Sequence, residues 1–466
     1  MTHHLFTHEH EPSRAQPGRA KPAARRRWAA LGTAAVCLCL AVAIAADTGH
    51  PAGPGTAASR AADAEQSRSY VVPGYHGYRA GRAGARASAR SVGRAYQFLT
   101  LMLNLHNPPG GSPAELPTLP QSYLGGVLGL EHYTVSTIYD DALVIDAYLA
   151  MHTGWGDVRA ERIGNALVYL QTHGPGRLYD QYRPGGVDSP DDVQAASPAS
   201  NTGDVAWAGL ALAQLYAATG NTRYLTAAIG IGRWIQANCL SNRGPGGYTG
   251  GYDSGGRITW KSTEHNIDVF ALFRLLARLT GQHVWLNWAQ HARRFVVAMW
   301  DWPPGVFDIG TTANGVSSNE SVQAEDVNTW SYLALQDPAY ETSVDWVMQN
   351  LTSHAGRFQG VSLSTCDRSG VWFEGTAHLA DALQSSPDPD GIQAAAGYLA
   401  DLRYAQAHGP DADGLGIMAA SENGLTDCQG DFVYASLHTG TTAWYILAAK
   451  AIDPLSATPL IEQPVR

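Results

Sequence analysis

The sequence is poor in charge, and beyond its first residues it has no basic cluster. Charged residues make up 15% of the 466 residues, and the formal net charge is -10. A nucleic-acid-binding surface needs Lys and Arg side chains to neutralise phosphates, and this chain supplies no stripe of them. We therefore expect no nucleic acid as partner. The hydrophobic content of 45% is ample for one large core.

Motifs of common metal, nucleotide and serine chemistry are lacking as well. The chain contains no His-Glu-x-x-His, no Walker loop and no Gly-x-Ser-x-Gly. These absences remove the commonest zinc, nucleotide and serine-hydrolase interpretations. The pair Asp140-Asp141 is not the aspartate-rich box that holds magnesium diphosphate. We expect neither a metal ion nor a cofactor.

Cysteine is also rare. Cys37 and Cys39 lie in an apolar stretch near the N-terminus, and the other three are too scattered for a metal site. Cys366 and Cys428 both fall in polar loops, where they either form a disulfide or stay reduced. Cys239 lies near a helix end, and we expect it to be a buried thiol.

The basic residues that stand out lie between positions 21 and 27, directly before an apolar run over residues 28–46. This order, with small residues at the end of the run, is the layout of a secretory signal. The paired arginines also fit twin-arginine export, and about nineteen apolar residues are enough for an uncleaved membrane anchor. We expect residues 1–46 to be a signal peptide or signal anchor and 47–87 a disordered linker. The protein would then be secreted or anchored outside the cytoplasmic membrane.

From about residue 88 onward, apolar residues recur at helical spacing, and the helices come in pairs. One helix of each pair opens on polar residues and is then apolar on nearly every side, whereas its partner is amphipathic. The apolar helices open at residues 139–143, 202–207, 262–268, 325–330, 372–377 and 438–444. The amphipathic helices are expected at residues 87–105, 159–171, 222–238, 282–300, 339–351 and 391–407. Such a repeat predicts twelve helices in two concentric layers, with no sheet larger than a hairpin.

The connections between these helices are of two kinds. Each apolar helix reaches its amphipathic partner through a tight turn, as at Thr219-Gly220-Asn221 and Thr280-Gly281-Gln282. The return to the next apolar helix takes about twenty to thirty residues, and long ordered loops are usually functional. The alternation places every long loop and the first turn of every apolar helix on one face. We expect a central cavity there.

This layout resembles the six-hairpin glycosidase-like proteins, which include mannanases, cellulases, unsaturated glucuronyl hydrolases and sugar epimerases. The phrase Gly209-Leu210-Ala211-Leu212, followed by Tyr216 to Leu225, is similar to the second hairpin of many of them. The resemblance covers residues 88–455 and implies an all-α fold, the (α/α)6 toroid, with residues 456–466 as a tail. It implies an enzyme acting on an oligosaccharide or polysaccharide, and we expect a monomer. The same fold also hosts lyases, epimerases and phosphorylases.

Glycoside cleavage needs one carboxylic acid that protonates the leaving oxygen and a second carboxylate that activates water or attacks the sugar. The acids in the first turns of the apolar helices are Asp140, Asp141, Asp204, Glu264, Asp326 and Glu374. We select Glu264 and Glu374 as the leading catalytic pair, facing each other across the cavity, with Asp204 and Asp141 as alternates. Acids at helix starts also serve as simple caps, which is the competing interpretation.

Side chains suited to a sugar accompany these acids. The predicted substrate contacts are His265, Asn266, Trp207, Tyr139, Trp330, Trp372, His438 and Trp260. The aromatic rings either stack on a sugar or pack in the core. Two other functions stay open: a lyase or epimerase that uses His265, His438 or a tyrosine as base, and a non-catalytic carbohydrate-binding protein.

Overall fold

The computed structural model describes residues 82–106 and 116–464. The predicted signal segment, and the linker as far as residue 81, lie outside the described residues. The helical domain begins at Arg82, ahead of the boundary expected near Ser88.

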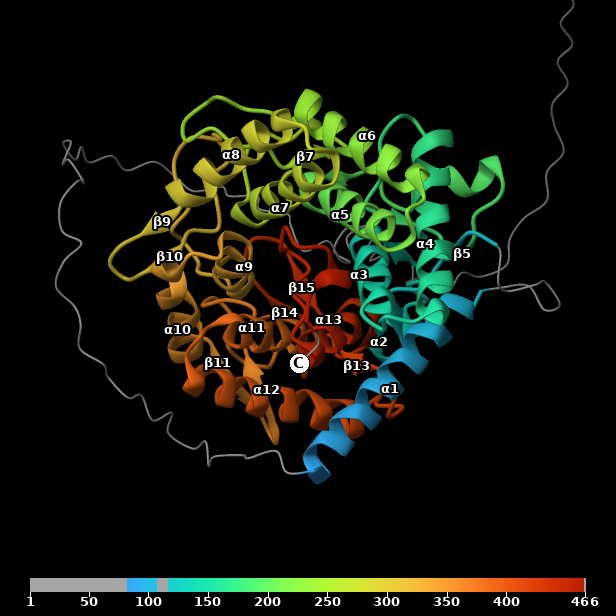
Figure 1. The fold of residues 1–466 in the computed structure, drawn as a ribbon. Helices are drawn as coiled ribbons and strands as arrows, with labels where there is room; N and C mark the ends of the chain where they lie inside the picture. Colours follow the sequence, from blue (N-terminus) through green and yellow to red (C-terminus); the bar gives the residue numbers. More distant parts are fainter. Residues whose placement is uncertain (1–81, 107–115, 465–466) are drawn as a thin grey trace, which may run out of the picture. The chain divides into compact units, whose positions relative to one another are not determined.

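Six helices form the inner layer of a ring, and six surround them (Figure 1). The inner helices are α3 (Ile138–Leu149), α5 (Thr202–Thr219), α7 (Thr263–Thr280), α9 (Glu325–Leu335), α11 (Phe373–Ser385) and α13 (Thr439–Lys450). The outer helices are α1 (Arg82–Asn104), α4 (Gly154–His173), α6 (Thr222–Cys239), α8 (His283–Ala298), α10 (Glu341–Asn350) and α12 (Pro389–His408). Every residue of α3 and of α9 is buried, as helices inside a second layer must be. The (α/α)6 toroid predicted from the sequence is confirmed.

The ring closes through the two ends of the domain. Each inner helix packs against the next, and α13 packs against α3. The first helix, α1, packs on α13 and so completes the sixth hairpin. The last described segment packs against inner helices, because the 3-10 helix η3 (Leu460–Glu462) contacts α3 and α5. There the Leu460 N–H donates to Gln214 Oε1 at 2.9 Å.

Local chemistry explains where the inner helices start and stop. Ser262 Oγ accepts the His265 N–H at the start of α7, and Thr137 Oγ1 accepts the Asp140 N–H at the start of α3. Gly220 and Gly281 end α5 and α7 in the left-handed conformation, with φ of 70° and 66°. Glycine is favoured there because it has no Cβ to clash. These are the tight turns that the sequence predicted.

The long connections carry one short α-helix, one 3-10 helix and all the strands of the described residues. The helices are α2 (Gly126–Leu130) and η1 (Pro190–Val193), whereas the 3-10 helix η2 (Pro338–Tyr340) lies in the short connection from α9 to α10. The first eight strands are β1 (Thr118–Leu119), β2 (Tyr123–Leu124), β3 (Ser136–Thr137), β4 (Gln181–Tyr182), β5 (Gly185–Gly186), β6 (Ser200–Asn201), β7 (Gly251–Asp253) and β8 (Gly256–Arg257). The others are β9 (Trp300–Asp301), β10 (Val306–Phe307), β11 (Thr352–Ala355), β12 (Phe358–Val361), β13 (Ile417–Met418), β14 (Leu425–Thr426), β15 (Phe432–Val433) and β16 (Leu437–His438).

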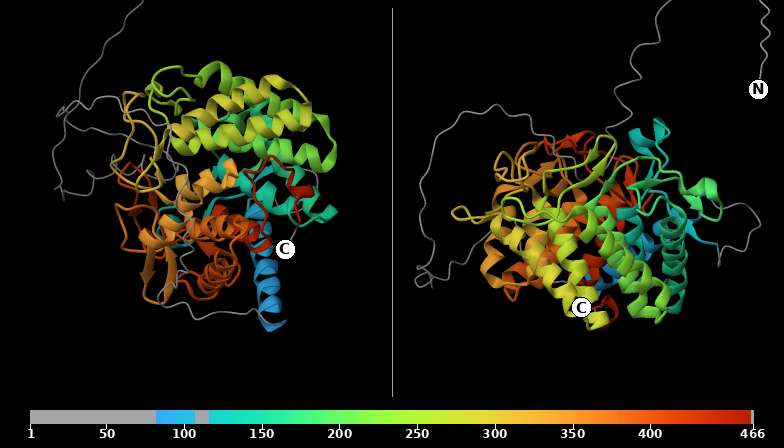
Figure 2. Two further views of the ribbon diagram at one scale, coloured as in Figure 1. Left: turned by 60° about the vertical axis from the view of Figure 1, so that its left-hand side comes forward. Right: turned by 90° about the horizontal axis from the view of Figure 1, so that it is seen from above.

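These strands tie neighbouring connections together, and one part of the sequence prediction is wrong here. Besides two-stranded pairs, the orders β13-β16-β2 and β6-β7-β8 make two three-stranded sheets, larger than the hairpins expected. In the first of them, the connection before α13 pairs with the connection before α3. Backbone groups of long loops need partners, and an adjacent loop supplies them. The long loops gather on one side of the helices, with the C-terminus on the other (Figure 2).

Aromatic rings fill the axis of the ring. Trp207 of α5, Trp330 of α9 and Trp444 of α13 contact one another with ring centroids 5.4 to 5.9 Å apart, and Tyr139 of α3 meets Trp207 at 5.4 Å. All four side chains are buried. The inside of the ring is therefore a packed core at this depth, and any substrate site must lie above it.

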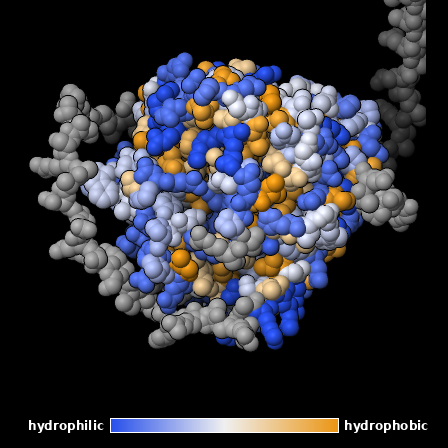
Figure 3. Space-filling view, viewed as in Figure 1, coloured by the Kyte–Doolittle hydropathy of each residue, from blue (hydrophilic) through white to orange (hydrophobic). Residues whose placement is uncertain are grey.

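The surface carries scattered apolar side chains, among them Leu130 with 80% and Trp302 with 67% of its area exposed. On the face shown in Figure 3, hydrophilic and hydrophobic residues are interspersed. Single exposed apolar residues are ordinary on protein surfaces. Among the helices in residues 82–106 and 116–464, we find none that combines the length and apolar character of a membrane span.

Candidate active site

A pocket of about 60 Å³ opens where α7 and α9 begin, on the side of the long connections. Four connections form it, namely those that lead into α7, α9, α11 and α13. Its carboxylates are Glu264, Asp326, Asp427 and Asp431, and Trp260 lies at its wall. A cavity of this size holds several water molecules, since one water needs only about 10 to 15 Å³.

Asp326, in the first turn of α9, is the most enclosed of these acids, with 5% of its surface exposed. Its Oδ1 accepts the Val327 N–H at 2.8 Å, which fixes the side chain. Burial and the neighbouring Asp427 together raise the pKa of Asp326 to about 6, although the hydrogen bond from Val327 opposes the shift. A carboxyl with such a pKa holds its proton at mildly acidic pH, as a general acid must.

Asp427 is fixed by its own loop. Its Oδ1 accepts the backbone N–H groups of Gln429, Gly430 and Asp431 at 2.8, 3.1 and 3.0 Å. Burial raises the pKa of Asp427, while these three N–H groups oppose the shift. A disulfide between Cys366 and Cys428, with Cα atoms 6.1 Å apart, ties this loop to the connection before α11. Of the two states that the sequence left open for this pair, the disulfide is the one that forms.

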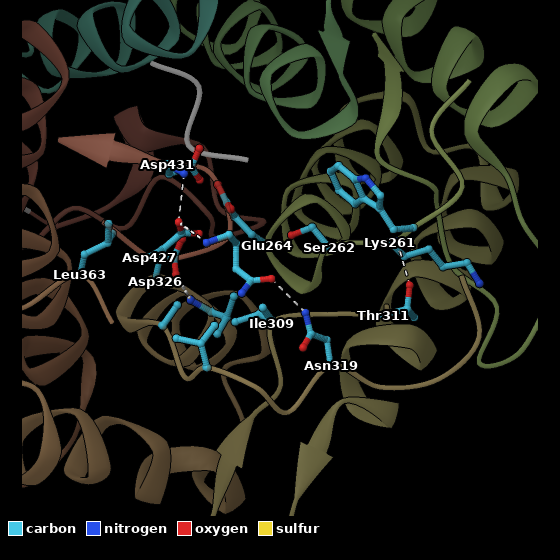
Figure 4. Close-up of a pocket in the computed structure, with 15 residues that line it drawn as sticks. Lys261, Ser262, Glu264, Ile309, Thr311, Asn319, Asp326, Leu363, Asp427 and Asp431 are labelled. Atoms are coloured by element: carbon cyan, nitrogen blue, oxygen red, sulfur yellow. Dashed lines mark hydrogen bonds between the residues drawn. The ribbon is translucent and has the colours of Figure 1, made fainter. Parts of the chain in front are cut away.

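Glu264 lies in the first turn of α7 and is partly exposed to the pocket. In Figure 4, Glu264, Asp326 and Asp427 lie close together, each on a different connection or helix start. Across the pocket, Asn319 donates to Gln429 Oε1 at 3.2 Å and links two of the connections. With Asp431, four carboxyl groups therefore share one cavity, which suits proton transfer to and from a substrate.

Glu374 does not line this pocket. Its side chain is fully buried, where the Tyr139 hydroxyl donates to Oε1 at 2.8 Å and the Thr441 hydroxyl donates to Oε2 at 3.2 Å. The reason is that the connection before α13 covers the start of α11: the Phe373 N–H donates to Ala419 O at 2.9 Å. The expected arrangement, with Glu264 and Glu374 facing each other across the cavity, is therefore not the one that forms.

Glu374 belongs to a buried cluster around His438. His438 Nε2 lies 3.2 Å from Asp140 Oδ1, and Nδ1 lies 3.2 Å from Glu374 Oε2. The ring also stacks on Tyr123 at a centroid distance of 4.3 Å. Burial alone would lower the pKa of His438, but the two carboxylates raise it to about 10. These two contacts thus favour the protonated imidazole.

A second imidazole–carboxyl contact continues this cluster. His378 Nδ1 lies 3.1 Å from Glu325 Oε2, and both side chains are fully buried. Burial lowers the pKa of His378 well below its usual value, and burial with Asp326 nearby raises that of Glu325. This pair is therefore neutral. Gly375 allows the close packing, because a Cβ there would lie 2.9 Å from Glu325 Oε2.

The alternate acids Asp204 and Asp141 do not line the pocket. Asp204 has 8% of its surface exposed, and Asp141 is fully buried. Asp141 Oδ1 accepts the Ser136 hydroxyl at 2.7 Å, and burial raises the pKa of Asp141 well above its usual value. Their catalytic roles stay predictions.

Among the predicted substrate contacts, Trp260 lines the pocket. Asn266 clamps the backbone of Tyr248, with its Oδ1 accepting the N–H at 2.8 Å and its Nδ2 donating to the carbonyl at 3.0 Å. His265 is fully buried, and burial lowers its pKa to about 3. Buried in the same way are Tyr139, Trp207, Trp330, Trp372 and His438. Their sugar contacts stay predictions, and substrate would reach them only through movement of the loops above.

The sequence patterns do not single out Asp427, Asp431 and Gln429 as pocket residues, and they mark Asp326 only as one of the first-turn acids. For Asp326 a signal existed, since it follows Glu325 directly at the opening of an inner helix. The other three lie in a connection whose path depends on distant partners. Within the residues that the structure describes, no three His, Cys, Asp or Glu side chains are grouped to hold a metal ion.

Comparison with known proteins identifies the fold. We find no family model that matches the chain. A search of curated proteins likewise finds no match. Among solved structures, cellobiose 2-epimerase from Bacillus thermoamylovorans superposes with a TM-score of 0.58 at 10% identity, over 78% of this chain and 98% of that one.

Two further solved structures have the same fold. A family 76 glycoside hydrolase from a bovine Bacteroides thetaiotaomicron strain gives a TM-score of 0.53 at 14% identity, over 77% of each chain. A D-mannose isomerase gives 0.54 at 10% identity, over 78% of this chain and 96% of that one. At such identities the likeness is one of fold.

Proposed function

We propose that this protein is a carbohydrate-active enzyme, a glycoside hydrolase that acts outside the cytoplasm. The observation that carries the proposal is the pocket in which Asp326, with its pKa raised to about 6, faces Asp427 and Glu264. A carboxyl group that keeps its proton beside further carboxyl groups is what glycoside hydrolysis requires. A hydrolase among the proteins of similar fold supports the substrate class.

In the proposed mechanism, Asp326 donates its proton to the glycosidic oxygen as the bond from that oxygen to the anomeric carbon breaks. Glu264 accepts a proton from a water molecule whose oxygen bonds to the same carbon. Asp427, held by three backbone N–H groups, stabilises the positive charge that develops on the sugar ring. Trp260 offers an aromatic face to the sugar. This assignment keeps Glu264 from the sequence prediction and replaces Glu374 by Asp326.

An epimerase or isomerase is the second candidate, because proteins with those activities have the same fold. Such chemistry needs a base that reaches the substrate. The histidines suggested for it by the sequence, His265 and His438, are buried and do not line the pocket. The carboxylates that do line it favour hydrolysis.

The test is incubation of the purified protein with a panel of oligosaccharides and polysaccharides, with three readouts. New reducing ends without any other product support hydrolysis. Absorbance of unsaturated uronates would replace the proposal with a lyase, and an isomerised sugar without chain cleavage would replace it with an epimerase. Binding without turnover across the panel would favour a carbohydrate-binding protein.

Export is part of the proposal. The disulfide Cys366–Cys428 supports it, because such bonds persist in oxidising compartments. The basic residues and apolar run over positions 21–46 supply the signal. Mass spectrometry of protein recovered outside the cytoplasm should find a new N-terminus near Ala46, or an intact chain in the membrane fraction. Recovery of intact protein only in the cytosol would contradict export.

A further inference from the structure

Beside the pocket lies a groove of about 290 Å³ with a different lining. It runs along the connection between α6 and α7, and Arg243, Thr249, Arg257 and Thr259 are among its wall residues. The chain passes directly from one site to the other, because Thr259 lines the groove and the next two residues line the pocket. Its volume is close to the lower end of ligand pockets, about 300 Å³.

The groove is cationic in a protein whose formal net charge is -10. Arg243 and Arg257 are exposed at its wall, and no Asp or Glu lines it. Lys261 adds a third positive charge at its edge, where Nζ donates to the Arg243 carbonyl at 2.6 Å. Burial and the Arg243 guanidinium lower the pKa of Lys261 to about 8. Positive charges that line one groove favour a bound anion.

Within residues 82–106 and 116–464, these cations form no ion pair with an acidic side chain. The ion pairs found between described residues involve Arg278, His378 and His438, and none includes Arg243, Arg257 or Lys261. Arg257 is oriented by one hydrogen bond, from Nη2 to the Leu240 carbonyl at 2.9 Å. A guanidinium carries five N–H donors, so most remain available for a ligand.

One residue of the groove wall carries an unsatisfied hydroxyl. Thr249 has only 5% of its surface exposed, and its Oγ1 finds no hydrogen-bond partner in the described part of the chain. Buried hydroxyls without partners are uncommon in native proteins and call for an explanation.

We propose that this groove binds an oxyanion carried by the glycan, the carboxylate of a uronic acid or a sulfate ester, and that the substrate is therefore an acidic glycan. The proposal rests on the hydrolase function for its biological meaning, but not for the binding itself. In Figure 4, Lys261 points away from Glu264, Asp326 and Asp427. An acidic sugar would thus be repelled by the pocket carboxylates and held by the groove, which orients the chain across the pocket.

The test compares charged and neutral probes of matched size. Glucuronate and glucose are titrated by calorimetry against wild type, the double variant Arg243→Gln with Arg257→Gln, and the control Arg233→Gln. Arg233 is an exposed residue of α6 that lines neither site. Wild type and the control should bind glucuronate and not glucose, and the double variant should bind it at least about tenfold more weakly. Binding should also weaken as salt is raised. The proposal would be contradicted if all three proteins bound glucuronate with equal affinity, or if wild type bound glucose as tightly as glucuronate.

Turnover separates this proposal from the hydrolase. If uronate-bearing glycans are cleaved and the double variant loses kcat/KM on them alone, a carboxylate is the oxyanion, whereas a loss confined to sulfated glycans identifies the ester. If no glycan is cleaved but glucuronate binding depends on the two arginines, the oxyanion-binding groove is supported and the hydrolase function is contradicted. If neutral glycans are cleaved as well as acidic ones and the double variant has no effect, the hydrolase function is supported and the oxyanion-binding groove is contradicted.

Discussion

The pocket carboxylates and the buried cluster beneath them occupy equivalent places in the ring and have opposite electrostatics. In the pocket, burial and the neighbouring Asp427 raise the pKa of Asp326. In the cluster, Asp140 and Glu374 each lie 3.2 Å from a ring nitrogen of His438 and raise the pKa of its imidazole. One first turn thus gives an acid suited to proton transfer, and the other gives a closed ion cluster. The loops determine this difference, because they leave the start of α9 open to the pocket and cover the start of α11.

The largest effect should follow from Asp326→Asn. Loss of a general acid costs at least about a hundredfold in rate. Stability should stay near that of wild type, because the amide oxygen can still accept the Val327 N–H. Initial rates on a cleaved glycan and thermal melting measure the two effects. Glu320→Gln, an exposed change outside the pocket, is the control. Near-normal turnover would contradict the role of Asp326 as general acid, and Asp204 and Asp141 would then be the acids to test.

Glu374→Gln should instead lower the stability of the fold. Removing one carboxylate leaves the buried His438 cation half compensated, and breaking a buried ion pair costs about 3 to 5 kcal/mol. Denaturant unfolding at neutral pH measures this loss, with the exposed Glu422→Gln as control. A variant that unfolds like wild type but has lost turnover would restore the catalytic role that the sequence predicted for Glu374.

Activity and stability should depend on pH through Asp326 in the pocket. Asp326 must be protonated to act as acid, so kcat/KM should fall about tenfold per pH unit above about 6. The folded pKa of Asp326 exceeds the ordinary value of 3.8, so its contribution to stability is full at low pH and is lost as pH rises from about 4 to 6.

His438 titrates in a separate window. Its folded pKa of about 10 exceeds the ordinary 6.5, so its contribution is full below about 6.5 and is lost as pH rises toward 10. Unfolding free energies from pH 4 to 10 should therefore fall in two steps. Asp326→Asn should reduce the acidic step and keep the alkaline one. Part of the acidic step should remain, because burial also raises the pKa of Asp308 to about 6 and that of Asp453 to about 7. An acidic step of unchanged size in the variant would contradict the assignment.

The ring was predictable because its signals are local. Apolar positions at helical spacing, the caps at Ser262 and Thr137, and the left-handed Gly220 and Gly281 lie within a few residues of the feature that they determine. The predicted amphipathic helix over residues 222–238 ends one residue short of the observed Cys239. Such signals place the helices but do not say which helix starts remain open.

The pocket could be predicted only in part, because its other half depends on distant contacts. Glu264 and Glu374 look alike in sequence, each an acid in the first turn of an inner helix. What separates them is the Ala419 carbonyl that pairs with the start of α11. Asp427 takes its place through its own turn and through a disulfide that spans 62 residues. Pairings of this range leave no periodic pattern in the sequence.

The disulfide offers a moderate test of how far the loops control the pocket. Cys366→Ser with Cys428→Ser should lower the unfolding free energy by about 2 to 4 kcal/mol. It should also lower kcat/KM severalfold, because the Asp427 turn loses its attachment. A reductant should reproduce both losses in wild type and have no effect on the variant. Full activity after reduction would mean that the turn holds Asp427 unaided.

The smallest effect should come from a pair of helix caps, one at the pocket and one on the outer layer. Ser262 Oγ accepts the His265 N–H at 3.4 Å at the start of α7, and Thr153 Oγ1 accepts the Gly156 N–H at 3.2 Å at the start of α4. Replacing either by Ala should cost about 0.5 to 2 kcal/mol, by denaturant unfolding. Only Ser262→Ala should also lower kcat/KM, by a few fold, because Ser262 lines the pocket and orients the turn that carries Glu264. If both variants keep full activity, the position of Glu264 does not depend on its cap, and the packed inner helix alone holds it in place.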